Sequence, residues 1–102
     1  MKLRSTNYLY LNINGLKSHF QNLRDIMAIH HYPDVVALVE TNLKPNEVQY
    51  YNINNYVHIP YNANPQKNKG SGISLYINRD IKFTKLLMNY ENHIEYSILS
   101  YP

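Results

Sequence analysis

The chain has 102 residues, a length that suits one small domain or part of a larger one, and its 44% hydrophobic content argues against disorder. The absence of cysteine excludes disulfides and thiolate metal sites, and the apolar runs are far shorter than the roughly 20 residues of a membrane span. A formal net charge of +3 and a pI of about 9.1 favour anionic partners such as nucleic acid, although ordinary solubility charge explains the excess equally well.

The first part of the chain predicts a strand, a helix and a second strand. Residues 7–12 alternate apolar and polar positions, and Asn14-Gly15 then ends this strand. Apolar residues at steps of three and four predict an amphipathic helix over 16–30, which ends before Pro33. The apolar face of this helix comprises Leu16, Phe20, Leu23, Met27 and His30. The continuous run Val35–Val39 predicts a strand buried on both faces.

The second part predicts one short helical turn and several strands. Pro45-Asn46-Glu47 suits the turn, because proline is favoured in the first turn of a helix. We expect strands at 56–60, 72–78, 81–87 and 94–99, an exposed polar loop at 61–71 and a turn at 89–92. This order predicts an α/β (α+β) fold with antiparallel pairing late in the chain.

Polar motifs end the first two predicted strands. Asn12 ends the first strand, and Glu40 follows the second. If a helical crossover makes these strands neighbours, both motifs lie at the carboxyl edge of the sheet, where α/β sheets bind ligands. A carboxylate there is costly to bury without a cation or a hydrogen-bond partner, and Glu40 with Asn12 suits Mg²⁺. The alternative is that Glu40 caps a strand end and that Asn12 and Asn14 only form the turn.

The order of these motifs resembles the endonuclease/exonuclease/phosphatase superfamily, which includes apurinic endonucleases, deoxyribonuclease I and the endonuclease domains of LINE-type retrotransposons. The motifs are Asn12-Ile13-Asn14-Gly15-Leu16, Pro33-Asp34, Glu40-Thr41 and Gly70-Ser71-Gly72. The first is closest to the retrotransposon branch, because apurinic endonucleases more often have Asp in place of Asn14. The resemblance implies that residues 1–102 are a partial domain, the amino-terminal half of a four-layer α/β/β/α sandwich with a mixed, largely antiparallel sheet.

The resemblance implies a Mg²⁺-dependent, DNA-nicking endonuclease, with Mn²⁺ as an alternative metal. Glu40 would be the principal metal ligand, and Asn12 and Asn14 would contact the metal, its water or the phosphate. Asn42 stands where Lys or Trp is frequent in the family. The family's later Tyr, its Asp-x-Asn segment and its final Asp and His have no counterpart here. We therefore expect the chain to be inactive alone and to need a carboxyl-terminal half, accompanied in the retrotransposon branch by a reverse transcriptase.

Several alternatives stay open at this point. Lys67 and Lys69 could contact nucleic-acid phosphate, although a solvated loop explains them better. Eleven tyrosines are not evidence of base stacking without geometry, because A/T-rich codons also explain them. The chain could be a non-catalytic truncated remnant that binds nucleic acid weakly, or a phosphatase or phosphodiesterase for a non-DNA substrate. No secretory signal follows Met1, so we expect an intracellular protein, nuclear by resemblance, without membrane contact. The sequence does not indicate an oligomeric state.

Overall fold

A mixed four-stranded sheet covered by one helix carries the predicted motifs. A computed structural model describes residues 7–66, 70–81, 85–91 and 94–100, the last two ranges by their backbone alone. The elements are β1 (Tyr8–Asn12), α1 (Leu16–Ile29), β2 (Val35–Val39), η1 (Pro45–Tyr50, a 3-10 helix), β3 (Tyr56–Tyr61), β4 (Ile73–Asn78), β5 (Lys85–Glu91) and β6 (Ile94–Ser100). No helix in these ranges has the length and apolarity that a membrane crossing requires.

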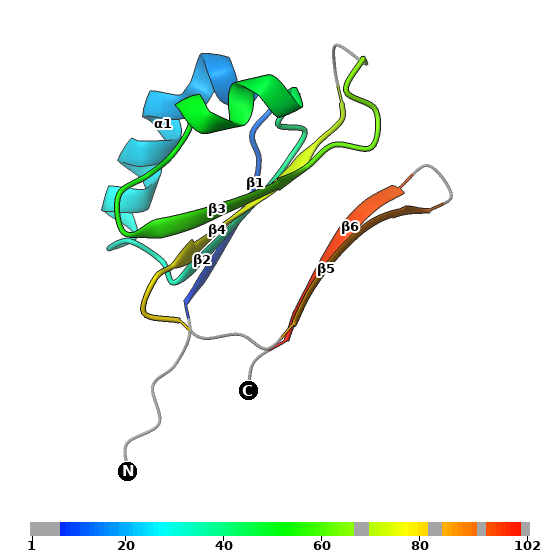
Figure 1. The fold of residues 1–102 in the computed structure, drawn as a ribbon. Helices are drawn as coiled ribbons and strands as arrows, with labels where there is room; N and C mark the ends of the chain where they lie inside the picture. The colour runs from blue at the N-terminus through cyan, green and yellow to red at the C-terminus, as the bar shows by residue number, and fades with distance from the viewer. Residues whose placement is uncertain (1–6, 67–69, 82–84, 92–93, 101–102) are drawn as a thin grey trace.

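The strand order in the main sheet is β1-β2-β4-β3. β1 and β2 are parallel neighbours joined by α1, and Asn12 lies opposite Val39 in their register. β4 pairs antiparallel with both β2 and β3, so the sheet is mixed as the sequence predicted. β5 and β6 form a separate antiparallel pair. In Figure 1 this pair lies on the opposite side of the main sheet from α1.

The helix buries one face against the sheet. Leu16, Leu23 and Met27 are almost fully buried, and they pack in one core with Val36 and Leu38 of β2, Tyr56 of β3 and Tyr76 of β4. His30 is exposed, so its inclusion in the apolar face was wrong. The reason is that α1 ends at Ile29 and His30 is its C-cap, beyond the last turn that packs on the sheet.

The opposite face of the sheet has its own apolar cluster. Val35, Leu75 and Ile77 are buried there, with Ala37 and Ile59 packed beside them. β2 therefore buries residues on both faces, as its unbroken apolar run predicted. Pro60 is tolerated because β3 is an edge strand, where a missing N–H leaves no ladder bond unmade.

The late strand boundaries differ from the prediction. β5 begins at Lys85, not at Ile81, and it continues through Glu91. The turn predicted at 89–92 was therefore wrong for Asn89, Tyr90 and Glu91. Cross-strand pairing explains the difference, because β6 supplies a partner for each position up to Glu91, which lies opposite Ile94. Pairing along a whole hairpin outweighs the local turn preference of single residues.

His58 on β3 is neutral and partly enclosed. Its ring stacks on Tyr76, with centroids 4.2 Å apart, and its Nε2 shares a 2.8 Å hydrogen bond with the Ser74 hydroxyl. Its Nδ1 is buried without a hydrogen-bond partner. Burial lowers the pKa of His58 from 6.5 to about 4, because the charged ring would lose its hydration.

This histidine predicts acid sensitivity of the fold. Between pH 6.5 and 4 the unfolded chain takes up a proton at this position that the folded chain does not, so the free energy of unfolding falls as the pH decreases. The loss should be at most about 3 kcal/mol, measured by urea unfolding across this range. His58→Phe keeps a ring against Tyr76 and removes the titration. An equally steep loss in His58→Phe would contradict the assignment to His58.

Candidate active site

Backbone hydrogen bonds join the two predicted motifs beyond the ends of their strands. Ile13 N–H donates to Val39 O (3.1 Å), Gly15 N–H to Glu40 O (2.8 Å) and Leu16 N–H to Thr41 O (2.9 Å). The parallel pairing of β1 and β2 thus continues into the connections that follow both strands. The two motifs share the carboxyl edge of the sheet, as the βαβ arrangement required.

Asn12 and Asn14 form the turn after β1. The Oδ1 atom of Asn12 accepts a 3.2 Å hydrogen bond from Asn14 N–H, which makes an Asx turn. Both residues are exposed, and Asn14 has a left-handed backbone with φ 49°. The Nδ2 group of Asn12 has no hydrogen-bond partner among the described residues. The turn therefore uses the Oδ1 atom of Asn12 and leaves its Nδ2 group available to a ligand.

Glu40 is held at the same edge in an unusual backbone conformation. Its φ is 57°, a left-handed value that costs a residue with a Cβ roughly 1–2 kcal/mol. Its side chain is half-buried, and within the described ranges no side chain or backbone group hydrogen-bonds its carboxylate. An unneutralised, half-buried carboxylate on a strained backbone is a feature that folding alone does not favour.

Thr41 and Gly72 connect this edge to β4. Thr41 is 1% exposed, and its N–H donates to Gly72 O at 3.1 Å. Gly72 has φ 92°, and a Cβ placed on it would lie 2.4 Å from Thr41 Oγ1. Only glycine fits this position, because any side chain would overlap the buried threonine. The Gly70-Ser71-Gly72 motif is identified from the sequence only as part of the family resemblance, and no sequence pattern indicates this packing role.

Asn42 is a second residue whose role the sequence did not reveal. Its Oδ1 accepts a 3.2 Å hydrogen bond from Ser71 N–H, and its own N–H donates to Ser71 O at 2.8 Å. Its Nδ2 lies 3.8 Å from the point where a Cβ on Gly15 would stand. Asn42 therefore lies between the connection after β1 and the one before β4. The only available signal was its left-handed tendency, which asparagine shares with glycine.

Left-handed residues gather at this edge. They are Asn14, Gly15, Glu40, Asn42 and Gly72, all with φ between 49° and 99°. Three separate connections carry them, and hydrogen bonds join those connections to one another. Strained backbone tends to concentrate at ligand sites, where the surrounding structure holds it in place. This concentration agrees with a functional role for the edge without assigning one.

The described part of the chain supplies only part of a metal site. It contains no cluster of three or more His, Cys, Asp or Glu side chains placed to hold a metal ion. Glu40 offers a carboxylate, and Asn12 Oδ1 keeps one lone pair after accepting from Asn14 N–H. Both are hard oxygen ligands of the kind that Mg²⁺ accepts together with water. Lys67 and Lys69, the predicted phosphate contacts, lie outside the described residues.

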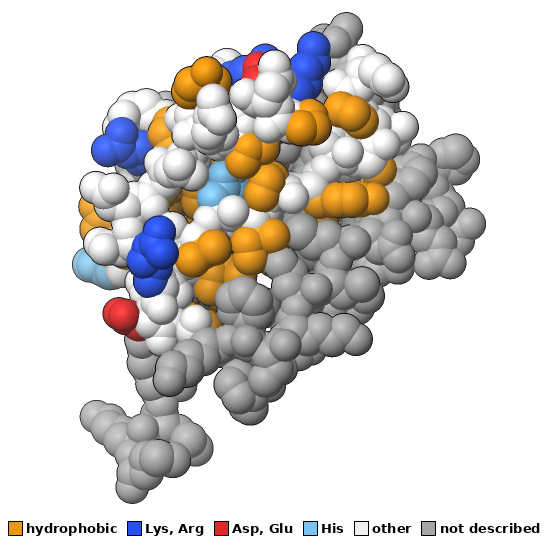
Figure 2. Space-filling view, viewed as in Figure 1, with side chains coloured by type: hydrophobic (Ala, Val, Ile, Leu, Met, Phe, Trp, Pro, Cys, Tyr) orange, Lys and Arg blue, Asp and Glu red, His pale blue; other side chains and the backbone are white. Residues whose placement is uncertain are grey.

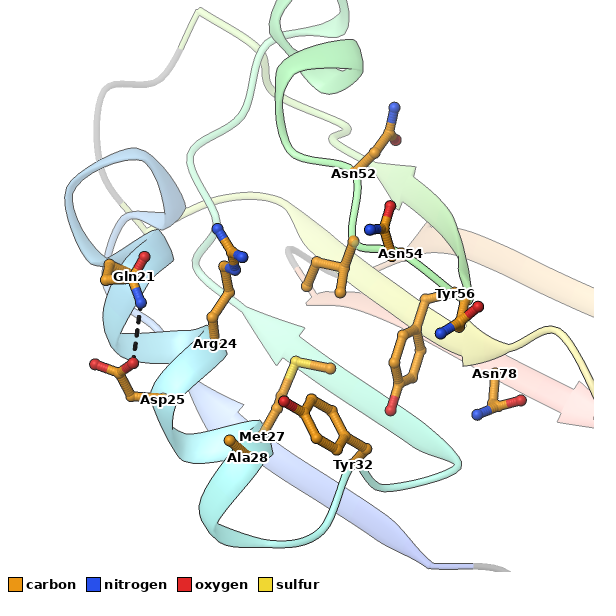
Figure 3. A pocket seen from close by; sticks show the side chains of 12 residues that line it. Gln21, Arg24, Asp25, Met27, Ala28, Tyr32, Asn52, Asn54, Tyr56 and Asn78 are labelled. Atoms are coloured by element: carbon orange, nitrogen blue, oxygen red, sulfur yellow. Dashed lines mark hydrogen bonds between the residues drawn. The ribbon is translucent and has the colours of Figure 1, made fainter.

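Two hollows flank these elements at opposite ends of the sheet. One, of about 410 Å³, adjoins the Glu40 edge. It is lined by Thr41, Leu43, Pro45, Val48, Pro60, Tyr61, Asn62 and Ile73. The other, of about 750 Å³, lies at the far end between α1 and residues 52–56 (Figure 3). On the face shown in Figure 2 the Lys and Arg side chains are scattered, so the net charge of +3 forms no single basic patch there.

Comparisons with known proteins agree with this architecture. A model of the Endonuclease/Exonuclease/phosphatase family matches residues 9–99. No curated protein matches the chain. Among solved structures, the chain is similar to the 3′ phosphatase NExo from Neisseria, bound to a product DNA hairpin, with 12% identity and a TM-score of 0.65. The match covers 84% of this chain and 32% of that one, so the chain spans about a third of that structure. At this identity the likeness shows the fold alone.

The packing of Gly72 against Thr41 gives a direct test of how this edge is held. Gly72→Ala should lower the free energy of unfolding by about 2–3 kcal/mol, because it adds a steric overlap to a left-handed backbone. Thr41→Ala removes the overlapping atom, so the double variant should lose less than the sum of the single losses when measured by urea unfolding. Strictly additive losses would argue against the contact.

Proposed function

The chain belongs to the endonuclease/exonuclease/phosphatase family, and on this basis we propose that it forms the metal-binding side of a phosphodiesterase active site. Family members generally use a divalent metal such as Mg²⁺. We assign Glu40 as the principal metal ligand, with Asn12 and Asn14 beside it. The observation that carries the proposal is the state of Glu40. Its side chain is half-buried, its backbone is strained, and its carboxylate has no hydrogen-bond partner within the described ranges.

The backbone around Glu40 favours this role over simple strand capping. A capping carboxylate gains its stability from nearby N–H donors. The side-chain carboxylate of Glu40 accepts no hydrogen bond within the described ranges. Its own carbonyl accepts from Gly15 N–H at 2.8 Å, which fixes the residue relative to the turn after β1. The backbone of Glu40 is therefore fixed at this edge, while its carboxylate is not neutralised within the described ranges. A bound cation would offset both its desolvation and its strain.

The polar groups of the turn would act on the substrate phosphate. Asn12 Nδ2 is a free donor within the described residues and can bind a phosphate oxygen or a water on the metal. The Asx turn holds its carboxamide, so little side-chain freedom is lost on binding. A divalent metal bound there would neutralise charge that develops on the phosphate. The chain itself would bind and orient the phosphodiester at this edge.

We propose that the general base lies beyond these 102 residues. Hydrolysis needs a group that takes a proton from water within hydrogen-bond reach. The family's Asp-x-Asn segment and its final Asp and His have no counterpart in this sequence. The solved relative is about three times longer than the matched segment, which leaves room for the base in a carboxyl-terminal half. On this proposal residues 1–102 are a partial domain, inactive alone.

DNA is the substrate that we propose, with nicking as the reaction. The support is the DNA hairpin bound by the Neisseria relative and the net positive charge of this chain. The Asn12–Leu16 motif favours the retrotransposon branch, in which a reverse transcriptase would accompany the endonuclease and the target would be nuclear DNA. A non-DNA phosphodiester and a non-catalytic remnant are the competing outcomes of the experiments below.

Metal binding tests the role of Glu40 independently of activity. Mn²⁺ added to the chain should broaden the amide NMR signals of residues 12–16 and 40–42. Glu40→Asn should lose most of this broadening, and it should also raise the free energy of unfolding by about 0.5–1 kcal/mol, because asparagine tolerates a left-handed backbone.

Asp80→Asn is the matched control for this experiment. It removes an exposed carboxylate from the turn after β4, so the broadening at residues 12–16 should stay as in the unchanged chain. Broadening that survives Glu40→Asn undiminished would sink the metal-ligand assignment. A loss of stability in Glu40→Asn would show instead that the carboxylate serves the fold.

Activity tests the reaction and the need for a second half. The 102-residue chain should not nick supercoiled plasmid with Mg²⁺, whereas a protein extended by the coding sequence beyond Pro102 should do so. Glu40→Ala in the extended protein should lower nicking at least about a hundredfold. Equal nicking with and without the substitution would overturn the proposed site. The absence of any completing frame would favour the remnant.

A further inference from the structure

The larger of the two hollows, of about 750 Å³, lies at the amino end of β2. Glu40 lies beyond the opposite, carboxyl end of this strand. Asn78, at the end of β4, donates its N–H to Asp34 O just before β2 begins. Tyr56, at the start of β3, donates its hydroxyl to Pro33 O. The floor of the hollow is thus tied to the amino end of β2, whereas Glu40 follows its carboxyl end. A volume of this size suits a nucleotide-sized ligand.

The walls of the hollow combine one cation, Arg24, and one carboxylate, Asp25, with several carboxamides. Figure 3 shows Arg24 on the α1 side and Asn52, Asn54 and Asn78 on the other side. Arg24 is exposed, and no described carboxylate pairs with it; its neighbour Asp25 accepts instead from Gln21 Nε2 at 2.9 Å. The side chains of Asn54 and Asn55 also have no hydrogen-bond partner among the described residues. The hollow therefore combines the Arg24 guanidinium, the Asp25 carboxylate that accepts from Gln21, and carboxamide donor and acceptor groups that the described residues leave unused.

Tyr32 supplies an aromatic ring to this hollow from a backbone that hydrogen bonds hold in place. It is 60% exposed, and its φ is 56° although it precedes Pro33, where an extended backbone is strongly preferred. Its N–H donates to Met27 O at 2.8 Å, and His31 N–H donates to Ala28 O at 3.1 Å. These two bonds are the Schellman pattern, which closes the helix and fixes the backbone from which the Tyr32 side chain extends.

The backbone strain around the hollow has no explanation in the core. His31, Tyr32 and Asn55 all have left-handed φ values, between 56° and 70°. Glycine is the usual residue at the left-handed position of a Schellman ending, and here His31 occupies it. A large exposed ring follows at Tyr32, where burial gives it little stability. Tyr32 and Asn55 line the hollow, whereas His31 only precedes Tyr32, and strained residues in the lining of a hollow are typical of ligand sites.

We propose that this hollow binds single-stranded nucleic acid. A base would stack on Tyr32, an adjacent phosphate would pair with Arg24, and the carboxamides of Asn54 and Asn55 would meet the base edge. Carboxamides donate and accept at once, as base edges do, which favours a base over an aliphatic peptide side chain. A paired duplex keeps its bases stacked inside the helix, so only an unpaired strand can place one in the hollow.

This second site is independent of the proposed active site. The two lie at opposite edges of the sheet and share no residue. A strand held at Arg24 and Tyr32 would position nucleic acid on the chain without occupying the Glu40 edge. Glu40→Asn should therefore leave binding at the hollow unchanged, so a failure of one proposal does not affect the other.

An NMR titration of the 102-residue chain with a four-nucleotide oligothymidylate at low salt tests the site. Amide signals of α1 residues 24–28 and of residues 52–56 should shift, and the shifts give a dissociation constant. Tyr32→Asn removes the ring and suits the left-handed backbone, so it should weaken binding about tenfold without unfolding the chain. Arg24→Gln should also weaken binding, and it should reduce the slope of log affinity against log salt by about 0.7.

Matched control variants distinguish the hollow from general charge and exposed aromatic surface. Tyr50 is 70% exposed and lies outside the hollow, and Lys44 is an exposed cation beside η1. Tyr50→Asn and Lys44→Gln should leave the affinity within about twofold of the unchanged chain. The proposal is overturned if the oligonucleotide shifts no signals at the hollow, or if the control variants weaken binding as much as Tyr32→Asn and Arg24→Gln do.

Discussion

The parallel pairing of β1 and β2, continued past their ends, is the constraint on which the candidate active site depends. Without the bonds from Gly15 N–H to Glu40 O and from Leu16 N–H to Thr41 O, the connections after these strands would diverge. With them, the Asn12 turn and Glu40 stay together. Thr41 N–H then extends the network to Gly72, so the connection before β4 is held as well. Backbone bonds alone thus bring three distant segments of the chain to one edge.

This network explains why residues with a Cβ tolerate left-handed conformations there. A left-handed glutamate or asparagine is unfavourable in isolation, but here hydrogen bonds within and between the connections hold the backbone. Glu40 accepts at its carbonyl from Gly15, and Asn42 binds Ser71 through both backbone and side chain. The strain is therefore distributed over a bonded framework. Within the described residues, this framework holds the backbone of Glu40 but provides no hydrogen bond to its carboxylate.

Periodicity in the sequence predicted most of the secondary structure, because local patterns there agree with the pairing. The unbroken run Val35–Val39 is buried on both faces, and the apolar spacing in 16–29 matches the face that α1 buries. The pattern failed at residues 89–91, where pairing with β6 outweighed turn-forming side chains. The shared edge of Asn12 and Glu40 could also be predicted, since it follows from a βαβ crossover. The roles of Gly72 and Asn42 could not, because they depend on contacts across 29 or more residues.

The two edges of the sheet differ in the kind of binding that their groups favour. The Glu40 edge presents a carboxylate and carboxamides on a rigid backbone, a set that attracts cations and repels a bare phosphate. On the proposed function, a phosphodiester would approach this edge once a divalent metal had reversed the local charge. The Arg24 edge presents a cation, the Asp25 carboxylate, a ring and carboxamides, a set in which Arg24 and Tyr32 would contact an anionic, planar ligand without a metal. On the two proposals, nucleic acid would therefore need a divalent metal at the Glu40 edge, whereas at the other edge its phosphate would pair directly with the Arg24 guanidinium.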